Sequence, residues 1–257
     1  MKVRDLVGAM DAIAPTRLAA TWDNVGLLVG DETAHVSKTL LTIDCTREVV
    51  EEARTIGCQA VVSYHPPIFT AVKSVLAGSV GYELVCAGLS LVSPHTAFDA
   101  AAGGTNDVLA DALGMGERSP LRRAPSPDDA YGFGRIGEVG PAPLSAIVQR
   151  IKNGLGLAHV LLAGSLERVV SRVAVCAGSG GDLLSDAMIA GAQLFVTGEM
   201  RHHDVLRAAA GGLATVCLLH SVSERCALSV LRRRLALKLP EVDFVLSTAD
   251  REPFVFA

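Results

Sequence analysis

The sequence predicts an α/β protein with two similar lobes, each built on a mixed, largely parallel sheet. Short aliphatic runs alternate with segments of helix length along almost the whole chain, which is typical of β-α-β units. The second half repeats the pattern of the first, and histidines and acids gather where the predicted strands end. These three observations define the expected fold class and the place where a site should form.

The first lobe is predicted to span residues 1–123. The segment from Met1 to Pro15 has an apolar stripe interrupted by acids and ends at a proline, so we expect an amphipathic helix. Thr46 can cap a helix that runs to Ile56, because its hydroxyl can accept from first-turn amides, and Gly57 then ends that helix. The remaining expected elements are strands at Thr39–Ile43, Ala60–Ser63 and Leu89–Ser93, and helices at Val80–Ala87 and Asn106–Leu113.

Residues 114–130 carry three prolines, mixed charge and no hydrophobic period, which indicates a connection between lobes. We place the linker at residues 124–130 and the second lobe at residues 131–257, with an exchange of terminal segments between lobes left open. The second lobe is predicted to contain strands at Tyr131–Val139, Val169–Cys176, Gln193–Thr197, Thr215–Leu219 and Val242–Ser247, and helices at Leu144–Lys152, Leu183–Ala190 and Ser223–Leu235.

The two halves contain matching segments. Residues 57–63 and residues 191–197 each lead from a glycine helix stop into a buried strand with a hydroxyl at its end. The next strand in each half is followed by a histidine with an acid four residues later, His95 with Asp99 and His220 with Glu224. A weak internal duplication explains both matches, and two such lobes facing each other would bring their strand ends together.

Composition restricts the class of protein. Hydrophobic residues make up 50% and charged residues 19%, so the chain folds around an aliphatic core, and the net charge of −4 gives no overall attraction to nucleic acid or acidic lipid. The longest runs without charge or histidine, such as residues 208–219, are well short of the ~20 residues of a membrane span. The N-terminus lacks a secretion signal and the six cysteines form no CxxC pair, so we expect a cytoplasmic protein with reduced thiols.

The residues with metal-binding chemistry follow four predicted strands. Ligands of parallel α/β sheets bind at the carboxyl ends of strands, and five of the seven histidines lie in these loops. Imidazoles and carboxylates without thiolates suit a divalent ion such as Zn, Mn, Fe or Ni, and argue against a closed structural zinc. The four groups are Tyr64 with His65, His95 with Asp99, Glu199 with His202 and His203, and His220 with Glu224.

Each of these groups also has a purely structural interpretation. His65 precedes two prolines and could simply hydrogen-bond to backbone, Asp99 could cap a helix, and Glu224 could be a first-turn acid. His202 and His203 are adjacent, and adjacent residues on a helix point apart, so both are not expected to bind one ion. A purely structural interpretation must, however, treat it as chance that potential metal ligands follow four equivalent strand ends.

A glycine-rich loop follows another predicted strand. Gly178, Ser179, Gly180 and Gly181 precede an acid and a predicted helix, so their backbone amides could hold an anion. Position 183 is leucine, where the dinucleotide-binding motif has its third glycine, and no P-loop lysine follows. A dinucleotide or P-loop site is therefore not supported.

The chain resembles a known family, the NIF-three-like dinuclear metal proteins, whose members are often called type 2 GTP cyclohydrolase I homologues. The matching motifs occur in the family's order over nearly the whole chain, and the chain resembles the short form without an inserted middle domain. The motifs are Trp22-Asp23-Asn24-Val25-Gly26-Leu27, Tyr64-His65-Pro66-Pro67-Ile68-Phe69, His95-Thr96-Ala97-Phe98-Asp99, Gly103-Gly104-Thr105-Asn106-Asp107, Gly134-Arg135-Ile136-Gly137, Gly178-Ser179-Gly180-Gly181, Thr197-Gly198-Glu199-Met200-Arg201-His202-His203 and His220-Ser221-Val222-Ser223-Glu224.

The resemblance implies a toroidal hexamer of two-lobed chains, with a two-metal site in the cleft between the lobes of each chain. Carried over by motif, the metal ligands fall on His65, Asp99, His220 and Glu224, and the first histidine of the family's His-His-Pro motif falls on Tyr64. A phenol with a pKa of ~10 coordinates poorly unless a metal deprotonates it. We therefore expect one tight ion and one weak or absent ion.

Two functions follow from the resemblance. The first is a metal-dependent hydrolase in which metal-bound water attacks a nucleotide-like substrate, with the guanine imidazole carbon of GTP as the target in the cyclohydrolase version. Glu199 or His202 would move protons, while His95 and the loop of Gly178, Ser179, Gly180 and Gly181 would contact the substrate. The alternative is a non-catalytic metal-binding ring that acts as an adaptor or in metal handling. A DNA-binding ring draws no support from the net charge of −4.

Overall fold

The computed structural model describes residues 1–126 and 128–255, and the chain divides into two compact units. Unit 1 contains residues 1–98 and the C-terminal segment that starts at Leu228, and unit 2 contains Asp99–Ala227. This division differs from the predicted boundary at residues 124–130, of which residue 127 lies outside the described residues. The C-terminal segment joins unit 1 because its last strand pairs with a strand of that unit's sheet.

Unit 1 is built on a five-stranded sheet with the order β1-β4-β3-β2-β11. All neighbouring pairs are parallel except β1 with β4, which is antiparallel. The central strand β3 is buried along its whole length, as expected for a parallel strand covered on both faces. The strands are β1 (Gly26–Val29), β2 (Lys38–Thr42), β3 (Ala60–Ser63), β4 (Ser90–Ser93) and β11 (Asp243–Leu246).

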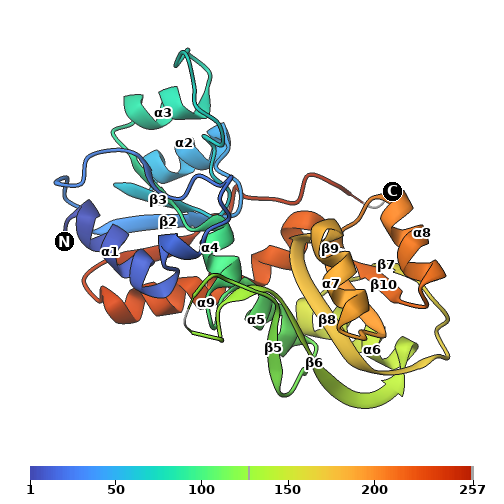
Figure 1. Ribbon diagram of the computed structural model, residues 1–257. Coiled ribbons are helices and arrows are strands. Elements are labelled where there is room, and N and C mark those ends of the chain that lie inside the picture. Colours follow the sequence, from blue (N-terminus) through green and yellow to red (C-terminus); the bar gives the residue numbers. More distant parts are fainter. Residues whose placement is uncertain (127, 256–257) are drawn as a thin grey trace. The chain divides into compact units, whose positions relative to one another are not determined.

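Helices cover both faces of the unit 1 sheet (Figure 1). Helices α2 (Arg47–Thr55) and α3 (Val80–Cys86) lie over one face, where Val49, Ala53 and Leu84 pack on the aliphatic side chains of β2, β3 and β4. Helix α1 (Val3–Ile13) and the C-terminal part of α9 (His220–Lys238) lie on the other face. Thr46 caps α2 as predicted, since its hydroxyl accepts a hydrogen bond from the amide of Val49.

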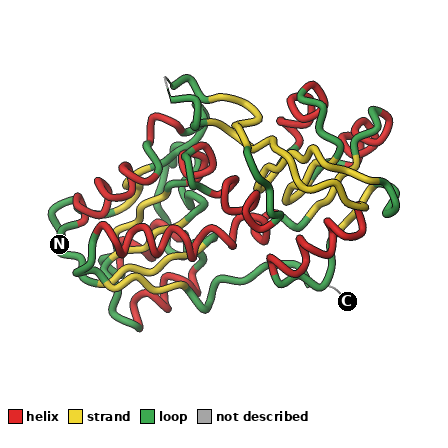
Figure 2. Tube along the Cα trace, turned by 90° about the horizontal axis from the view of Figure 1, so that it is seen from below, coloured by secondary structure: helices red, strands yellow, loops and turns green. Residues whose placement is uncertain are grey.

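Unit 2 contains a six-stranded sheet with the order β5-β6-β8-β9-β10-β7. Strands β8, β9 and β10 run parallel, and the outer strands pair in antiparallel fashion. Figure 2 shows the strands of each unit as a layer with helices on both sides. The strands are β5 (Arg118–Arg123), β6 (Gly132–Pro143), β7 (Leu161–Ala163), β8 (Val169–Ser179), β9 (Leu194–Glu199) and β10 (Ala214–Cys217).

Two apolar clusters hold the helices of unit 2 on its sheet. Side chains of α5 (Thr105–Ala112) and α6 (Leu144–Leu155) pack on one face, and those of α7 (Leu184–Ile189) and α8 (His202–Ala210) pack on the other. The remaining short elements are two 3-10 turns, η1 (Thr16–Leu18) and η2 (Gly181–Leu183), and helix α4 (His95–Ala100). None of the described helices is both long and apolar enough to cross a bilayer.

The predicted internal duplication appears in side-chain contacts as well as in strand order. The Gln59 side-chain oxygen accepts hydrogen bonds from the amides of Ser37 and Lys38, and the Gln193 oxygen accepts from the amides of Ser171 and Arg172. Each residue of the second set lies 134 positions after its counterpart in the first. An antiparallel edge strand also precedes the parallel strands in both units, β1 in unit 1 and β7 in unit 2.

The structure corrects the predicted alignment of the two histidine loops by one residue. Leu91 pairs with Val61, and Thr215 pairs with Phe195, so β4 corresponds to β10 with a shift of 124 positions. His95 therefore corresponds to Leu219, and these are the two non-glycine residues with positive φ among those described, 27° and 81°. The match of His95 with His220 in the sequence rested on residue type and missed this backbone equivalence.

The predicted elements are present, and the structure adds elements that were not predicted, among them β5, β7 and α4. Strand β5 lies inside the stretch predicted to be irregular, where its mixed charge hides a strand that pairs with β6 at the edge of the sheet. All six cysteines are free, as expected for reduced thiols. Only Cys86 is exposed, while Cys45, Cys58 and Cys176 are buried.

Candidate metal centre

His65 follows β3 and has a carboxylate on one ring nitrogen. Its Nδ1 lies 2.8 Å from Oδ1 of Asp44, a residue just beyond the end of β2. Because β2 and β3 are parallel neighbours, their carboxyl ends meet at the same edge of the sheet. A carboxylate on Nδ1 fixes the ring orientation and the tautomer, so Nε2 is the atom that can bind a metal.

His95 has the same kind of partner. Its Nδ1 lies 2.8 Å from Oδ1 of Asp23, whose other oxygen accepts hydrogen bonds from the amide and hydroxyl of Thr96. Burial acts to raise the pKa of Asp23, but the hydrogen bonds from His95 and Thr96 outweigh it and hold that pKa below its ordinary value. Asp23 is therefore a carboxylate at neutral pH and supports a protonated Nδ1 on His95.

Tyr64 lies close to both His65 and His95 in unit 1. Its side chain is fully buried, and its ring centroid is 5.4 Å from that of His65 and 6.0 Å from that of His95. The two imidazoles are themselves 5.3 Å apart and nearly perpendicular. The structure thus brings three of the predicted site residues, Tyr64, His65 and His95, into one cluster at the strand ends of unit 1.

A cavity of about 990 Å³ opens beside His65 in the same unit. Its lining combines Asp44, His65 and the start of α2 with residues of the C-terminal segment, including Asp250 and Arg251. Asp250 is held in place, since its carboxylate accepts a hydrogen bond from the amide of Ile43. His65 therefore borders a space large enough for a small molecule.

His220 and Glu224 form the corresponding pair in unit 2. Glu224 is 3% exposed and its Oε1 lies 3.2 Å from Nε2 of His220, while Glu199 Oε1 lies 3.0 Å from His220 Nδ1. His220 begins α9 directly after Leu219, and Glu224 follows one helical turn later on the same face. The strained backbone of Leu219 turns the chain sharply from β10 into this helix.

Gly178 makes room for the His220–Glu224 pair. A Cβ atom at this position would lie 2.6 Å from Glu224 Oε1 and 3.3 Å from His220 Nε2, and its φ of +67° also favours glycine. The Gly178 amide donates to the hydroxyl of Ser223, which in turn donates to the carbonyl oxygen of His220. The glycine at the end of β8 thus keeps space next to two potential ligand atoms.

Asp99 belongs to unit 2, and a hydrogen bond to its main-chain carbonyl oxygen holds it in place. The Asn106 amide group donates to the carbonyl oxygen of Asp99 and accepts from the amide of Ala177, the residue before Gly178. Burial raises the pKa of the Cys176 thiol, and the negative charges of Asp99 and Glu224 raise it further. Both carboxylates therefore act on the same thiol at the end of β8.

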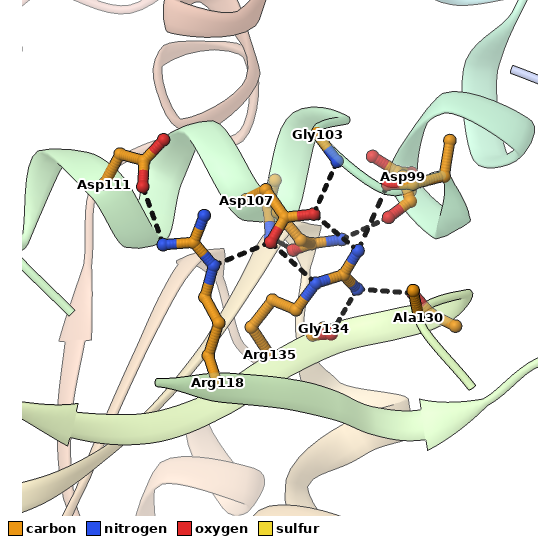
Figure 3. A network of polar contacts seen from close by, with 12 residues as sticks. Asp99, Gly103, Asp107, Asp111, Arg118, Ala130, Gly134 and Arg135 are labelled. Atoms are coloured by element: carbon orange, nitrogen blue, oxygen red, sulfur yellow. Dashed lines mark hydrogen bonds and ion pairs between the residues drawn. The ribbon is translucent and has the colours of Figure 1, made fainter. Parts of the chain in front are cut away.

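An ion-pair network supports the segment between Asp99 and α5 (Figure 3). Arg135 is 2% exposed, and it donates to both carboxylate oxygens of Asp107 and to the carbonyl oxygen of Ala101. Asp107 also accepts from the Gly103 amide and from Arg118. The family motifs around positions 103–107 and 134–137 therefore serve to hold the backbone that carries Asp99.

Two predictions for the site have less support in the structure. The amides of Gly178 and Gly180 already donate within the protein, to Ser223 Oγ and to the Glu199 carbonyl oxygen, so they are not available to an anion. His202 is exposed at the first position of α8, and its ring lies 5.4 Å from that of its neighbour His203. A phosphate role for the loop and a proton-transfer role for His202 stay predictions.

Three residues of the site were not singled out as site residues in the sequence. Asp44 follows a predicted strand, so the same strand-end rule could have found it. Asp23 lies in a polar turn that was noted as a motif without a role, and its partner His95 is 72 residues away in the sequence. Asn106 bridges to Ala177 across 71 residues. Partners at such distances leave no local pattern.

The donor set in each unit fits a divalent metal. Three histidines, His65, His95 and His220, have a carboxylate oxygen on Nδ1. This is the arrangement typical of metal-binding histidines. Glu224 adds a buried carboxylate, and Gly178 provides space that a side chain would fill. Imidazole and carboxylate donors without thiolates are the ligands of catalytic rather than structural ions.

The fold and these residues define a class of α/β proteins with paired β-α units and histidine–carboxylate pairs at the strand ends. A model of the Duf34/NIF3 (NGG1p interacting factor 3) family matches residues 1–253, and the chain belongs to this family. It is 33% identical to a Clostridium perfringens "GTP cyclohydrolase 1 type 2 homolog" over 262 residues, with 100% of both chains covered. It is 35% identical to the "Protein NIF3 homolog" of Schizosaccharomyces pombe, with 95% and 94% covered.

Solved structures show the same fold. A Staphylococcus aureus hypothetical protein matches with a TM-score of 0.91 and 28% identity, covering 100% of this chain and 99% of that one. A Bacillus cereus protein related to NIF3 matches with a TM-score of 0.93 and 20% identity, with 100% and 99% covered. The two-sheet α/β architecture is therefore that of the family.

Proposed function

We propose that this protein is a metal-dependent hydrolase that acts on a nucleotide-like substrate. In this proposal the ligands of the divalent ion are His65, Asp99, His220 and Glu224, as the family resemblance implies. The observation that supports it most is the carboxylate bonded to Nδ1 of each histidine at a strand end, at 2.8 Å for His65 and 3.0 Å for His220. A carboxylate on Nδ1 orients the ring and leaves Nε2 unprotonated, as metal binding through Nε2 requires.

A bound divalent ion would supply Lewis acidity and a water molecule with a pKa lowered to about 7. The protein's own groups would orient the substrate and move protons. Glu199 is exposed and bonded to His220, so it is placed to accept a proton next to the ligands, and His202 is the alternative. His95, whose ring is fixed by Asp23, would contact the substrate, together with amides of the Gly178–Gly181 loop such as that of Ser179.

The printed names of relatives favour GTP as the first substrate to test. The Clostridium perfringens relative and a Lactococcus lactis relative that is 31% identical over 210 residues are both named "GTP cyclohydrolase 1 type 2 homolog". We propose the toroidal hexamer of the family resemblance as the assembly of this chain, in the cytoplasm. Tyr64, which is fully buried at the position of a family ligand, favours one tight ion rather than two.

Turnover with added metal tests the hydrolase. Protein loaded with Mn, Zn or Fe should release formate from GTP or phosphate from another nucleotide, and a His220→Ala variant should lose this activity. A His35→Ala variant is the control, because His35 is exposed and lies outside the strand-end loops. Absence of turnover across a nucleotide panel with metal bound would contradict the hydrolase.

A non-catalytic metal-binding role, as adaptor or in metal handling, is the second candidate. The replacement of a family histidine by the buried Tyr64 favours it, because a chain that does not need a second ion has less need of a two-ion reaction. Partner capture by the intact protein distinguishes the two forms of this role. A partner retained after His220→Ala supports an adaptor, and a partner lost together with the metal supports metal handling.

A further inference from the structure

Two large aromatic side chains are exposed beside the histidines of unit 1. Trp22, the only tryptophan in the chain, is 59% exposed, and Phe69 is 47% exposed. Their ring centroids lie 5.6 Å apart with an angle of 40° between the planes. Tryptophan is highly buried on average, so an exposed pair of this size in a chain with only 4% aromatic residues calls for an explanation.

The pair is held in place by polar contacts from the same turn. Asn24 donates from its side chain to the carbonyl oxygen of Ile68, at 2.6 Å, and so ties the turn after Trp22 to the segment before Phe69. Asp23, between Trp22 and Asn24, is the carboxylate that orients His95. Three consecutive residues thus present a ring, fix a histidine and anchor the opposite loop.

The aromatic pair is next to His95, which in turn neighbours the proposed ligand His65. The His95 ring centroid lies 6.1 Å from that of Trp22 and 6.3 Å from that of Phe69, and it lies 5.3 Å from that of His65. All four rings belong to unit 1. A planar molecule in contact with Trp22 or Phe69 would therefore lie next to His95, which is proposed to contact the substrate and whose ring is 5.3 Å from that of the proposed ligand His65.

We infer that Trp22 and Phe69 form a stacking site for the planar heteroaromatic ring of the substrate, a nucleobase or a similar fused ring. Exposed aromatic faces bind bases by stacking, and the base then needs few specific hydrogen bonds. This inference rests on the proposed function for its link to catalysis, but not for ring binding itself. It assigns the ring-binding role to Trp22 and Phe69, which are separate from every proposed metal ligand.

The single tryptophan makes the site directly observable. We expect guanosine and GTP to quench the emission of Trp22 in metal-loaded protein, and ribose 5-phosphate at the same concentration to leave it unchanged. Quenching should saturate with the same dissociation constant that equilibrium dialysis gives. Unchanged emission at concentrations of GTP that saturate the protein would overturn the inference, as would equal quenching by ribose 5-phosphate.

Variants separate stacking from general packing. Phe69→Leu keeps the tryptophan reporter and should weaken guanosine binding roughly 5- to 150-fold, the range expected for loss of one stacked aromatic. Trp22→Leu, followed by dialysis, should show a similar loss. Phe254→Leu is the control, because Phe254 is 71% exposed and lies at the far end of the chain. Guanosine binding that is equal in Trp22→Leu and wild type would overturn the inference.

These measurements distinguish failure of the stacking site from failure of the proposed hydrolase. If Trp22→Leu still binds metal and cleaves a substrate without a ring, such as a simple phosphate ester, but no longer binds guanosine, both proposals stand. Metal-dependent turnover without any binding of guanosine or GTP would overturn the stacking site alone. Quenching by guanosine in a protein that binds no metal would overturn the hydrolase and leave the stacking site intact. Circular dichroism of each variant checks that the fold is retained.

Discussion

The carboxylates bonded to the strand-end histidines decide which ring nitrogen can bind a metal. Asp44 and Asp23 bond to Nδ1 of His65 and His95, and Glu199 bonds to Nδ1 of His220. In each case the carboxylate is as important as the histidine, because it fixes both the tautomer and the orientation of the ring. The other essential residue is a glycine, because its missing side chain keeps space beside Glu224.

Replacing Gly178 by alanine should damage the metal site. The added Cβ would meet Glu224 Oε1 and His220 Nε2, so we expect metal affinity to fall roughly 10- to 100-fold. Gly156→Ala is a matched control, since Gly156 has nearly the same φ, +68°, with no atoms within 4 Å of an added Cβ. Both variants carry the same backbone strain of ~1–2 kcal/mol. Equal metal affinity in the two variants, measured by competition with a chelating dye, would contradict this role for Gly178.

The cysteines should differ strongly in reactivity. Cys86 is exposed, whereas burial raises the pKa of Cys45 to about 12 and the pKa values of Cys58 and Cys226 to about 11. Because the thiolate is the reactive form, a disulfide reagent at pH 8 should label one thiol per folded chain rapidly, and Cys86→Ser should abolish that fast phase. Fast labelling of a second thiol in the folded protein would contradict this assignment.

The elements themselves show which features a sequence can predict. Thr46 at the start of α2 and Gly57 beyond its end gave its limits, and the buried run Ala60–Ser63 gave β3, because caps and apolar runs are local. Strand β5 was not predicted, since its arginines and proline resemble a loop and only pairing with β6 makes it a strand. The end of β8 was placed three residues early because its last residues pair irregularly with β9.

The Arg135–Asp107 pair should make unit 2 sensitive to acid. Burial acts to raise the pKa of Asp107, but the hydrogen bonds and charge of Arg135 outweigh it and keep that pKa below its ordinary value. The stabilisation is therefore complete above the unfolded pKa of about 3.9 and is lost as the pH falls through the lower folded value. Urea unfolding between pH 6 and pH 2 should show a smaller loss of stability in Asp107→Asn than in wild type. An equal loss in both would contradict this assignment.

Removing the buried arginine should be costly at neutral pH. Arg135→Met leaves Asp107 buried with only Arg118 as a charged partner, so the free energy of unfolding should fall by roughly 3 kcal/mol. Arg123→Met is the control, because the Arg123–Asp129 ion pair is exposed and exposed pairs contribute ~0–1 kcal/mol. Similar effects of the two substitutions in urea titrations would contradict a structural role for the network.

The two units share part of one β-α pattern, and this part of the fold was visible in the sequence. Gln59 and Gln193 make the same backbone contacts at equivalent positions, so the match of residues 57–63 with residues 191–197 reflects real structural equivalence. The limits of the compact units were not visible in the same way, because the C-terminal strand β11 pairs with β2 at the other end of the sequence. The residue types of the site were predictable, whereas a partner far away in the sequence, such as Asp23 for His95, was not.

The two repeats have diverged in the chemistry at their strand ends. Position 65 is histidine in unit 1, and the residue 134 positions later is Glu199 in unit 2, so the proposed ligand His65 corresponds to the proposed proton acceptor Glu199. The proposed metal centre requires both His65 and His220.

Metal content of single and double variants tests this requirement most directly. Elemental analysis after dialysis against graded chelator gives the number of bound ions and their affinity for wild type, His65→Ala, His220→Ala and the double variant. We predict one tightly held ion per chain in wild type, a loss of roughly tenfold or more in affinity in either single variant, and strong non-additivity in the double variant. Unchanged affinity in His65→Ala, or additive losses in the double variant, would contradict a single ion shared by His65 and His220.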